Sequence, residues 1–265
     1  SKGNVVTPLG LLDKHGSDAV RYWAASGRPG TDTAFDEGQM KIGRRLAIKI
    51  LNASRFVLLS GGSTEGGPVT EPLDASLLAS LAEVVEAATA ALEEYNYTRA
   101  LEVTETFFWS FCDDYLELVK ERARGEHGDA GAESARAALG TALSVFLRLF
   151  APFLPFVTEE VWSWWREGSV HAQRWPESAE LPGAGDPELL STVSIVLSGL
   201  RKSKSEAKVS MRTEVARAVV SAPELTLADL DAASADLRAA GRVRELVMVP
   251  GDALELEAVE LVSAG

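Results

Sequence analysis

The segment DEGQMKIGRRLAIKILNASRFVLL, residues 36–59, carries the clearest periodic pattern in the sequence. Its apolar side chains recur at helical spacing, and its cations lie largely on other sides of the same helical projection. The apolar positions are Met40, Leu46, Ile50, Ala53 and Val57, and the basic positions are Lys41, Arg44, Arg45, Lys49 and Arg55. The pattern predicts a long amphipathic helix with one basic face. An amphipathic helix buries its apolar side against a core, so we expect further helices around it.

Helical patterns continue on both sides of this segment. Thr7-Pro8 and Gly16-Ser17 each have the residue types that begin a helix, and they predict two short helices before residue 27. After the segment, three longer helices are predicted over residues 74–94, 96–124 and 132–150. Pro152 and Pro155 must break the last of these, Thr158 can cap a fresh helix, and residues 169–176 look extended.

The pattern changes after residue 186. A helix over residues 187–202 precedes a strand over 214–223, a helix over 226–241 and two further strands up to residue 262. The predicted fold class is therefore mainly α, with a helical bundle followed by a small mixed α/β subdomain. We predict three parts, namely an N-terminal segment over 1–35, the bundle over 36–185 and the α/β subdomain over 186–265.

The charge of the chain is unevenly distributed. The net charge of −13 argues against a generic nucleic-acid binder, but residues 1–60 carry nine Lys or Arg against five Asp or Glu, and residues 201–217 carry six against two. Local potential rather than total charge guides association, so these two basic regions could mark where an anion docks. The alternative is that both are ordinary solvated helix faces.

The residue types that support catalysis, metal binding or membrane insertion do not form recognisable patterns. His15, His127 and His171 lack metal-ligand spacing, and Cys112 has no second cysteine with which to form an internal disulfide. The apolar stretch LRLFAPFLPFVT is shorter than a membrane span, and the N-terminus lacks the order of a signal peptide. We therefore expect a soluble cytoplasmic protein with no metal site and no complete catalytic site.

One group on the long helix has the chemistry of a base-binding surface. Asn52, Arg55 and Phe56 are spaced i, i+3 and i+4, which places an amide, a guanidinium and an aromatic ring on one patch. A ring can stack on an unpaired base, an amide can read its edge, and a cation can neutralise a phosphate. The alternative, a core Phe56 beside a surface Asn52, is equally compatible with the sequence.

The order of motifs along the chain is similar to that of a known family. SKGNVVTPLGLLDKHGSDAVRYW resembles the segment that follows the KMSKS signature of class I aminoacyl-tRNA synthetases, and FDEGQMKIGRRLAIKILNASRFVL resembles the first helix of their anticodon-binding bundle. FFWSFCDDYLELVK, APFLPFVTEEVW and SVHAQRWP resemble later bundle helices and the exit strand of the valyl branch in particular. The resemblance covers residues 1–262.

The resemblance implies a function that spacing could not supply. It implies recognition of a tRNA anticodon stem and loop, expected to be valine-specific, by a chain that does not catalyse alone and whose partner is the catalytic domain of the same polypeptide. The expected tRNA-binding residues are Lys41, Arg44, Arg45, Lys49, Asn52, Arg55 and Phe56, and Arg201, Lys202 and Lys204 are expected to approach the RNA backbone. A remnant of the KMSKS loop would comprise Ser1, Lys2, Gly3 and Asn4. The chain itself would need no cofactor, whereas the intact enzyme would use ATP and Mg.

Two alternatives stay open from the sequence. One is a free-standing protein-interaction module derived from a synthetase, which the acidic stretch between the two basic regions favours. The other is the same region of an isoleucyl or leucyl relative.

Overall fold

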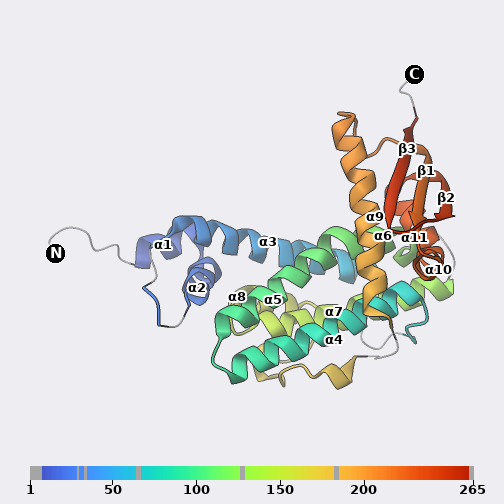
Figure 1. Cartoon of the computed structure of the whole chain (residues 1–265). Coiled ribbons are helices and arrows are strands. Elements are labelled where there is room, and N and C mark those ends of the chain that lie inside the picture. Colours follow the sequence, from blue (N-terminus) through green and yellow to red (C-terminus); the bar gives the residue numbers. More distant parts are fainter. Residues whose placement is uncertain are drawn as a thin grey trace. The chain divides into compact units, whose positions relative to one another are not determined.

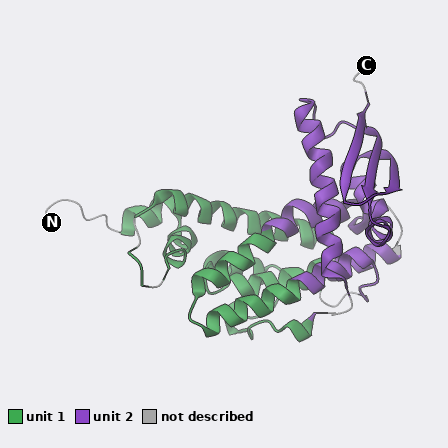
Figure 2. Cartoon of the chain, in the orientation of Figure 1, with its two compact units in different colours: residues 1–64, 81–108, 139–180 green, residues 65–80, 109–138, 181–265 purple. Residues whose placement is uncertain are grey.

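The computed structural model describes residues 8–28, 30–32, 35–63, 67–125, 129–181 and 185–262 (Figure 1). It is mainly helical with one three-stranded sheet, which confirms the predicted fold class. Two compact units are present, each built from three separate segments (Figure 2). Unit 1 contains residues 1–64, 81–108 and 139–180, and unit 2 contains residues 65–80, 109–138 and 181–265. The three-part division expected from the sequence stays a prediction.

The helices follow the predicted order. They are α1 (Pro8–His15), α2 (Ser17–Ala25), α3 (Glu37–Leu59), α4 (Pro72–Glu93), α5 (Tyr97–Ser110), α6 (Leu116–Ala123), α7 (Asp129–Phe150), α8 (Pro155–Ser163), α9 (Pro187–Glu206), α10 (Glu224–Ala232) and α11 (Ser234–Gly241). A π-helical turn, η1 (Phe111–Tyr115), separates α5 from α6, and short 3-10 turns lie at Val170–Ala172 and Ser178–Glu180. Residues 169–176, expected to be extended, therefore contain a helical turn.

Helix α3 packs in unit 1 as its pattern predicts. Its apolar positions are buried, and Asp36 caps its N-terminus by accepting a hydrogen bond from the Gly38 amide at 2.7 Å. Gly43 lets α2 approach closely, because a Cβ atom there would lie 2.5 Å from the Cβ of Tyr22. The Tyr22 hydroxyl donates to Glu105 at 2.7 Å. The face of α3 that packs on α2 is thus fixed, which leaves its basic side outward.

Helix α8 begins earlier than the sequence predicted. It starts at Pro155, whereas Thr158 is buried inside the helix and donates to the Leu154 carbonyl. The cap is supplied by Asp18 of α2, whose carboxylate accepts from the Phe156 and Val157 amides at 3.1 and 2.8 Å. Burial raises the pKa of Asp18, although both amide hydrogen bonds oppose this shift. A distant carboxylate satisfies the orphan amides, so the local cap is not needed.

The sheet lies in unit 2 with the strand order β2-β1-β3. Strand β1 (Val215–Ala222) pairs parallel with β2 (Val243–Pro250) and antiparallel with β3 (Glu255–Leu261). A parallel pair needs a crossover connection, and α10 and α11 form it. The sequence predicted one helix here, but the chain turns at Ala233 between two shorter helices. Helix α11 packs against β2, and α9 packs against β3.

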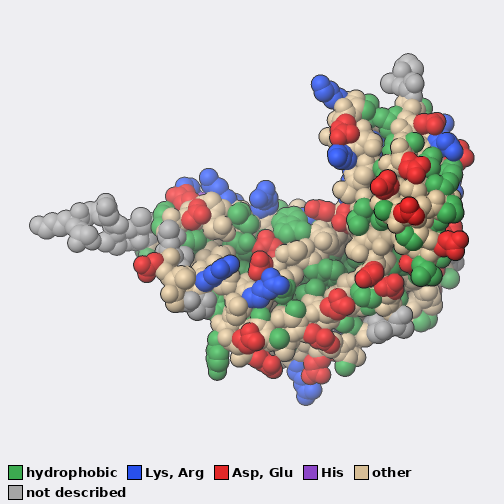
Figure 3. Space-filling model, in the orientation of Figure 1, with side chains coloured by type: hydrophobic (Ala, Val, Ile, Leu, Met, Phe, Trp, Pro, Cys, Tyr) green, Lys and Arg blue, Asp and Glu red, His purple; other side chains and the backbone are tan. Residues whose placement is uncertain are grey.

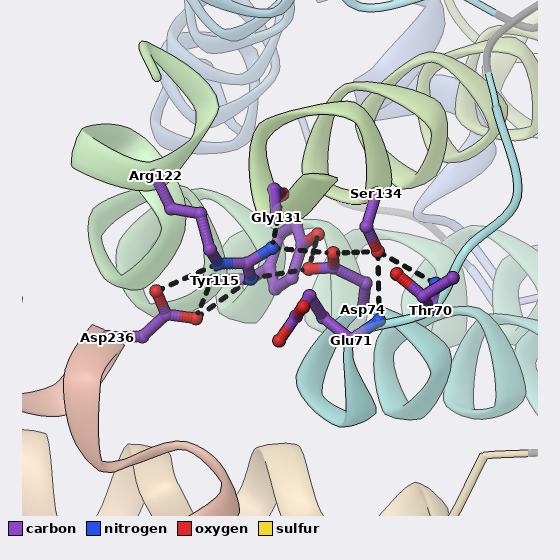
Figure 4. Close-up of polar contacts among 8 residues, drawn as sticks. All are labelled: Thr70, Glu71, Asp74, Tyr115, Arg122, Gly131, Ser134 and Asp236. Carbon is purple, nitrogen blue, oxygen red and sulfur yellow. Dashed lines mark hydrogen bonds and ion pairs between the residues drawn. The ribbon is translucent and has the colours of Figure 1, made fainter. Parts of the chain in front are cut away.

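A buried ionic cluster in unit 2 joins residues of α4, η1, α6, α7 and α11 (Figure 4). The Arg122 guanidinium of α6 contacts the carboxylates of Asp74 and Asp236, both at 2.8 Å, and donates to the Gly131 carbonyl at 2.9 Å. Asp74 also accepts hydrogen bonds from Tyr115 and Ser134, each at 2.7 Å. Burial alone would lower the pKa of Arg122, but the two carboxylates outweigh it and raise the pKa above its usual range. The cluster keeps Arg122 charged.

Helix α4 is the one helix in the described part of the chain that is long and apolar enough to cross a membrane. Buried positions such as Leu77, Leu81 and Val85 recur along it, and its first turn carries the ion-paired Asp74. The same length and composition are found in core helices of soluble proteins, and the buried positions on α4 fit that role.

Candidate nucleic-acid interface

The seven residues expected to bind tRNA all lie on α3 in unit 1. Lys41, Arg44, Arg45, Asn52 and Arg55 are exposed, and Lys49 and Phe56 are half-buried. Lys and Arg side chains project along this helix in the space-filling view (Figure 3). The structure therefore brings these residues onto one element, with none of the seven in the core.

Several of the cations on α3 have no acidic partner in the part of the chain that the structure describes. Within the described residues, no carboxylate pairs with Lys41, Arg45 or Arg55. Arg44 is held differently, because its guanidinium donates to the Lys14 carbonyl at 2.9 Å. Lys14 itself pairs with Glu37 at 2.5 Å, and this hydrogen bond, together with one from His15, lowers the pKa of Glu37. Unpaired surface cations are available to phosphates without first breaking an ion pair.

The base-binding group predicted at Asn52, Arg55 and Phe56 is placed toward solvent. Asn52 and Arg55 are exposed, whereas their neighbours Ala53 and Val57 are buried. Phe56 is half-buried, so its ring is partly accessible and is not a fully enclosed core residue. The geometry permits stacking on this ring, and the base-binding role stays a prediction.

A cavity beside α3 adds residues that the sequence did not single out. It has a volume of about 450 Å³ and is bordered by Arg44, Ile48 and Leu51 of α3 and by Phe156 and Glu160 of α8. Ile48 is 48% exposed and Phe156 is 63% exposed. Arg44 is the one lysine or arginine among its described lining residues, and Asp13, Asp18 and Glu160 line it as well, so the cavity offers apolar surface without a charge that favours a phosphate. Ile48, an apolar residue between the cations of α3, was the available signal in the sequence.

The second basic region in unit 2 differs from its prediction. Arg201 pairs with Asp114 at 3.0 Å, and Lys202 is exposed beside Glu206 at 3.9 Å. Lys204 is only 2% exposed, and its ammonium donates to the carbonyls of the chain. The expected surface contact of Lys204 with an RNA backbone is therefore wrong, because the group is enclosed by protein.

The remaining predictions concern catalysis and metals. Ser1, Lys2, Gly3 and Asn4 lie outside the described residues. Among the residues that the structure does describe, no group of three His, Cys, Asp or Glu side chains could hold a metal ion. The polar and aromatic groups on α3 in unit 1 are exposed cations, an amide and a partly exposed ring.

Comparison with known families agrees with this chemistry. The family profile for the anticodon-binding domain of tRNA ligase matches residues 74–220, which is more than half of the chain. The chain belongs to this family. The matched range starts after α3, so the assignment to the family does not depend on the basic helix from which the interface was built.

Relatives of known function cover the whole chain, including α3. The chain is 62% identical over 271 residues to a valine–tRNA ligase of Thermobifida fusca (strain YX), which covers 100% of this chain and 30% of that protein. Valine–tRNA ligases of Salinispora tropica and Cutibacterium acnes are 58% and 56% identical, covering 95% and 97% of this chain and 32% and 30% of their own length. The predicted resemblance to the valyl branch is confirmed. The chain spans about a third of the length of these relatives.

A solved structure has the same fold at low sequence identity. It is the crystal structure of the ternary complex of Agrobacterium radiobacter K84 agnB2 LeuRS, tRNA and LeuAMS. The match has a TM-score of 0.52 and 17% identity, and covers 97% of this chain and 32% of that one. At this identity the likeness supports the fold alone, which is that of a class I synthetase.

Proposed function

We propose that this anticodon-binding domain recognises the anticodon stem and loop of a valine-specific tRNA as part of a valine–tRNA ligase. The observation that carries the proposal is the row of exposed cations on α3 that lack acidic partners among the described residues, in a chain whose relatives are valine–tRNA ligases. The alternative of a leucyl or isoleucyl relative is not favoured by the identities to valyl enzymes.

The residues of α3 would make two kinds of contact with the RNA, to phosphates and to bases. Arg44, Lys49 and Arg55 would neutralise phosphates, which supplies affinity that falls as salt concentration rises. Asn52 and Phe56 would contact bases, and a stacked base contributes about 1–3 kcal/mol. Phosphate contacts fix the position of the RNA, whereas base contacts distinguish one anticodon from another.

The reaction of the intact enzyme is also part of the proposal. Attachment of valine to tRNA with ATP and Mg would require the catalytic domain expected from the family, and we expect this chain to bind tRNA without catalysing. The loop of residues 1–4 would contribute to that reaction only in the presence of that domain. We expect the enzyme to be cytoplasmic.

Binding measurements on the chain would test recognition. Fluorescence anisotropy with a valine tRNA and with an anticodon-swapped copy should give tighter binding of the former, and equal affinities for both would remove the recognition claim. The variant Arg44→Gln/Arg55→Gln should weaken binding and lower the slope of log K against log salt by about 2, since each lost phosphate contact lowers it by about 1.

A matched control removes two exposed charges elsewhere in unit 1. Arg99 and Arg174 are exposed and lie outside α3, so Arg99→Gln/Arg174→Gln changes the net charge by the same amount. The control should retain the affinity and the salt slope of the unchanged chain. If it lost as much as the α3 variant, the effect would come from total charge, and the assignment to α3 would be wrong.

A further inference from the structure

A buried lysine in unit 2 holds two separate chain segments together. Lys204 lies in the last turn of α9, and its Nζ donates to the Met211 carbonyl at 3.2 Å and to the Gly241 carbonyl at 2.8 Å. The first carbonyl belongs to the connection between α9 and β1, and the second belongs to the end of α11. Burial lowers the pKa of Lys204, and the charge of Arg242 lowers it further. The ammonium therefore fixes the place where two helix ends meet.

Three exposed cations surround this meeting point. Lys208 directly follows the cap of α9, Arg212 lies in the connection to β1, and Arg242 follows the last residue of α11. The Arg242 guanidinium donates to the Arg212 carbonyl at 3.3 Å, which places the last two next to each other. Figure 3 shows Lys and Arg side chains at this end of α9. We call Lys208, Arg212 and Arg242 the helix-end patch.

The helix-end patch is not neutralised by nearby acids. Over the described ranges, no carboxylate pairs with any of its three cations. The glutamates closest to it in sequence are engaged elsewhere, because Glu206 pairs with Lys202 and Glu214 pairs with Arg244. In a chain with a net charge of −13, Arg212 and Arg242 in contact, with Lys208 four residues beyond Lys204, give a local positive potential that attracts an anion.

The backbone at two of these cations has a conformation that favours glycine. Lys208 has φ 55° and Arg242 has φ 53°, the left-handed conformation in which glycine is favoured after a helix. A non-glycine residue in this region is conformationally strained. A cation at a helix C-terminus gains from the helix dipole, but Lys204 and Arg238 already supply cations in the last turns of α9 and α11. Helix stability alone therefore does not account for the two left-handed cations.

We propose that the helix-end patch binds the phosphate backbone of RNA. The proposal rests on the proposed function, since the RNA is the tRNA that the domain recognises. Three cations with no aromatic ring among them suit phosphates rather than bases, so the contact is independent of sequence. It supplies affinity to any tRNA, whereas α3 supplies the discrimination.

The left-handed backbone provides a variant that removes charge and spares the fold. Lys208→Gly/Arg242→Gly places glycine where glycine is conformationally favoured, so the thermal midpoint should stay the same or rise. Binding of valine tRNA should weaken, with the salt slope lowered by about 2. Binding of the anticodon-swapped tRNA should weaken by the same factor, because a backbone contact does not read the anticodon.

Two further variants complete the test. Arg212→Gln removes the third cation at a position with ordinary φ, and it should lower the slope by about 1. Lys120→Gln/Arg99→Gln removes two cations that are paired with Glu117 and Glu102, and it should leave binding unchanged. If this control weakens binding as much as the glycine variant, total charge explains the effect and the helix-end patch is overturned.

The outcomes separate the two proposals. If the glycine variant and Arg212→Gln bind tRNA like the unchanged chain, the helix-end patch does not bind RNA, while the assignment of recognition to α3 is unaffected. An acidic protein partner would give this result. If the unchanged chain binds neither tRNA, the proposed function fails, and this inference fails with it.

Discussion

Replacing Arg122 tests the buried ionic cluster of unit 2 directly. The guanidinium makes hydrogen bonds to both carboxylates, and the side chains of Asp74 and Asp236 are 0% and 8% exposed. Arg122→Met keeps most of the aliphatic bulk and removes the charge. Two carboxylates then remain in a poorly hydrated site without the cation that compensates them, which is the costly case for a buried ion pair.

The expected loss of stability is large on the scale of a whole domain. Removing one member of a buried pair costs about 3–5 kcal/mol, and Arg122 serves two carboxylates, so we expect about 4 kcal/mol or more. A domain is stable by only about 5–15 kcal/mol in total. Asp74 retains hydrogen bonds from Tyr115 and Ser134, which lessens the loss at that carboxylate. The variant should therefore fold, with greatly reduced stability.

Equilibrium unfolding in urea at pH 7, followed by far-UV circular dichroism, measures this loss. Arg99→Met is the matched surface control, because Arg99 forms an exposed pair with Glu102 and should lose about 0–1 kcal/mol. The triple variant Arg122→Met/Asp74→Asn/Asp236→Asn should recover much of the stability, since no charge remains buried. A loss below about 1 kcal/mol for Arg122→Met, or a triple variant no better than the single one, would refute the reasoning.

Three further predictions follow from packing and charge. Gly43→Ala should lower the thermal midpoint by several degrees, at a cost of about 1–3 kcal/mol, because the new methyl group meets Tyr22; an unchanged midpoint would contradict the close contact. The hydrogen bond from Arg148 lowers the pKa of Glu180 below its ordinary 4.5, so its contribution to stability should be complete above that pH and lost as the pH falls through the lowered value. Urea unfolding of Glu180→Gln should accordingly differ from the unchanged chain at pH 7 and coincide with it near pH 2. The buried thiol of Cys112 should react with Ellman's reagent only slowly in the folded chain and quickly in urea, and equal rates would show that it is accessible.

The sequence predicts the elements of this fold well where burial follows a period. The apolar face of α3 and the three strands have short-range patterns, and these are confirmed. The boundary at Ala233 and the early start of α8 were not predicted. The start of α8 does not depend on the residues nearest to it, since Asp18 caps α8 from 138 positions away.

The charged residues show the same limit more strongly. A basic residue in a polar stretch predicts a solvated side chain, and this holds for Arg45 and Arg55 but not for Lys204. The partners of Lys204 include a carbonyl 37 positions away, and Arg122 meets Asp236 across 114 positions. Pairings over such distances are set by the tertiary fold, so they cannot be predicted from spacing along the chain. The roles of the α3 residues in RNA binding stay predictions.

The π-helical turn η1 between α5 and α6 determines how the chain there should respond to a deletion. It accommodates one residue more than a regular α-helical turn would. Tyr115 is its last residue, Arg122 follows it in α6, and both belong to the ionic cluster. Loss of a single residue from η1 would convert it into a regular α-helical turn, so the residues after it would keep their direction, whereas the same loss inside α6 would rotate the residues after it by about 100°. The chain should consequently tolerate a deletion of one codon in η1 better than one in the regular helices on either side of it.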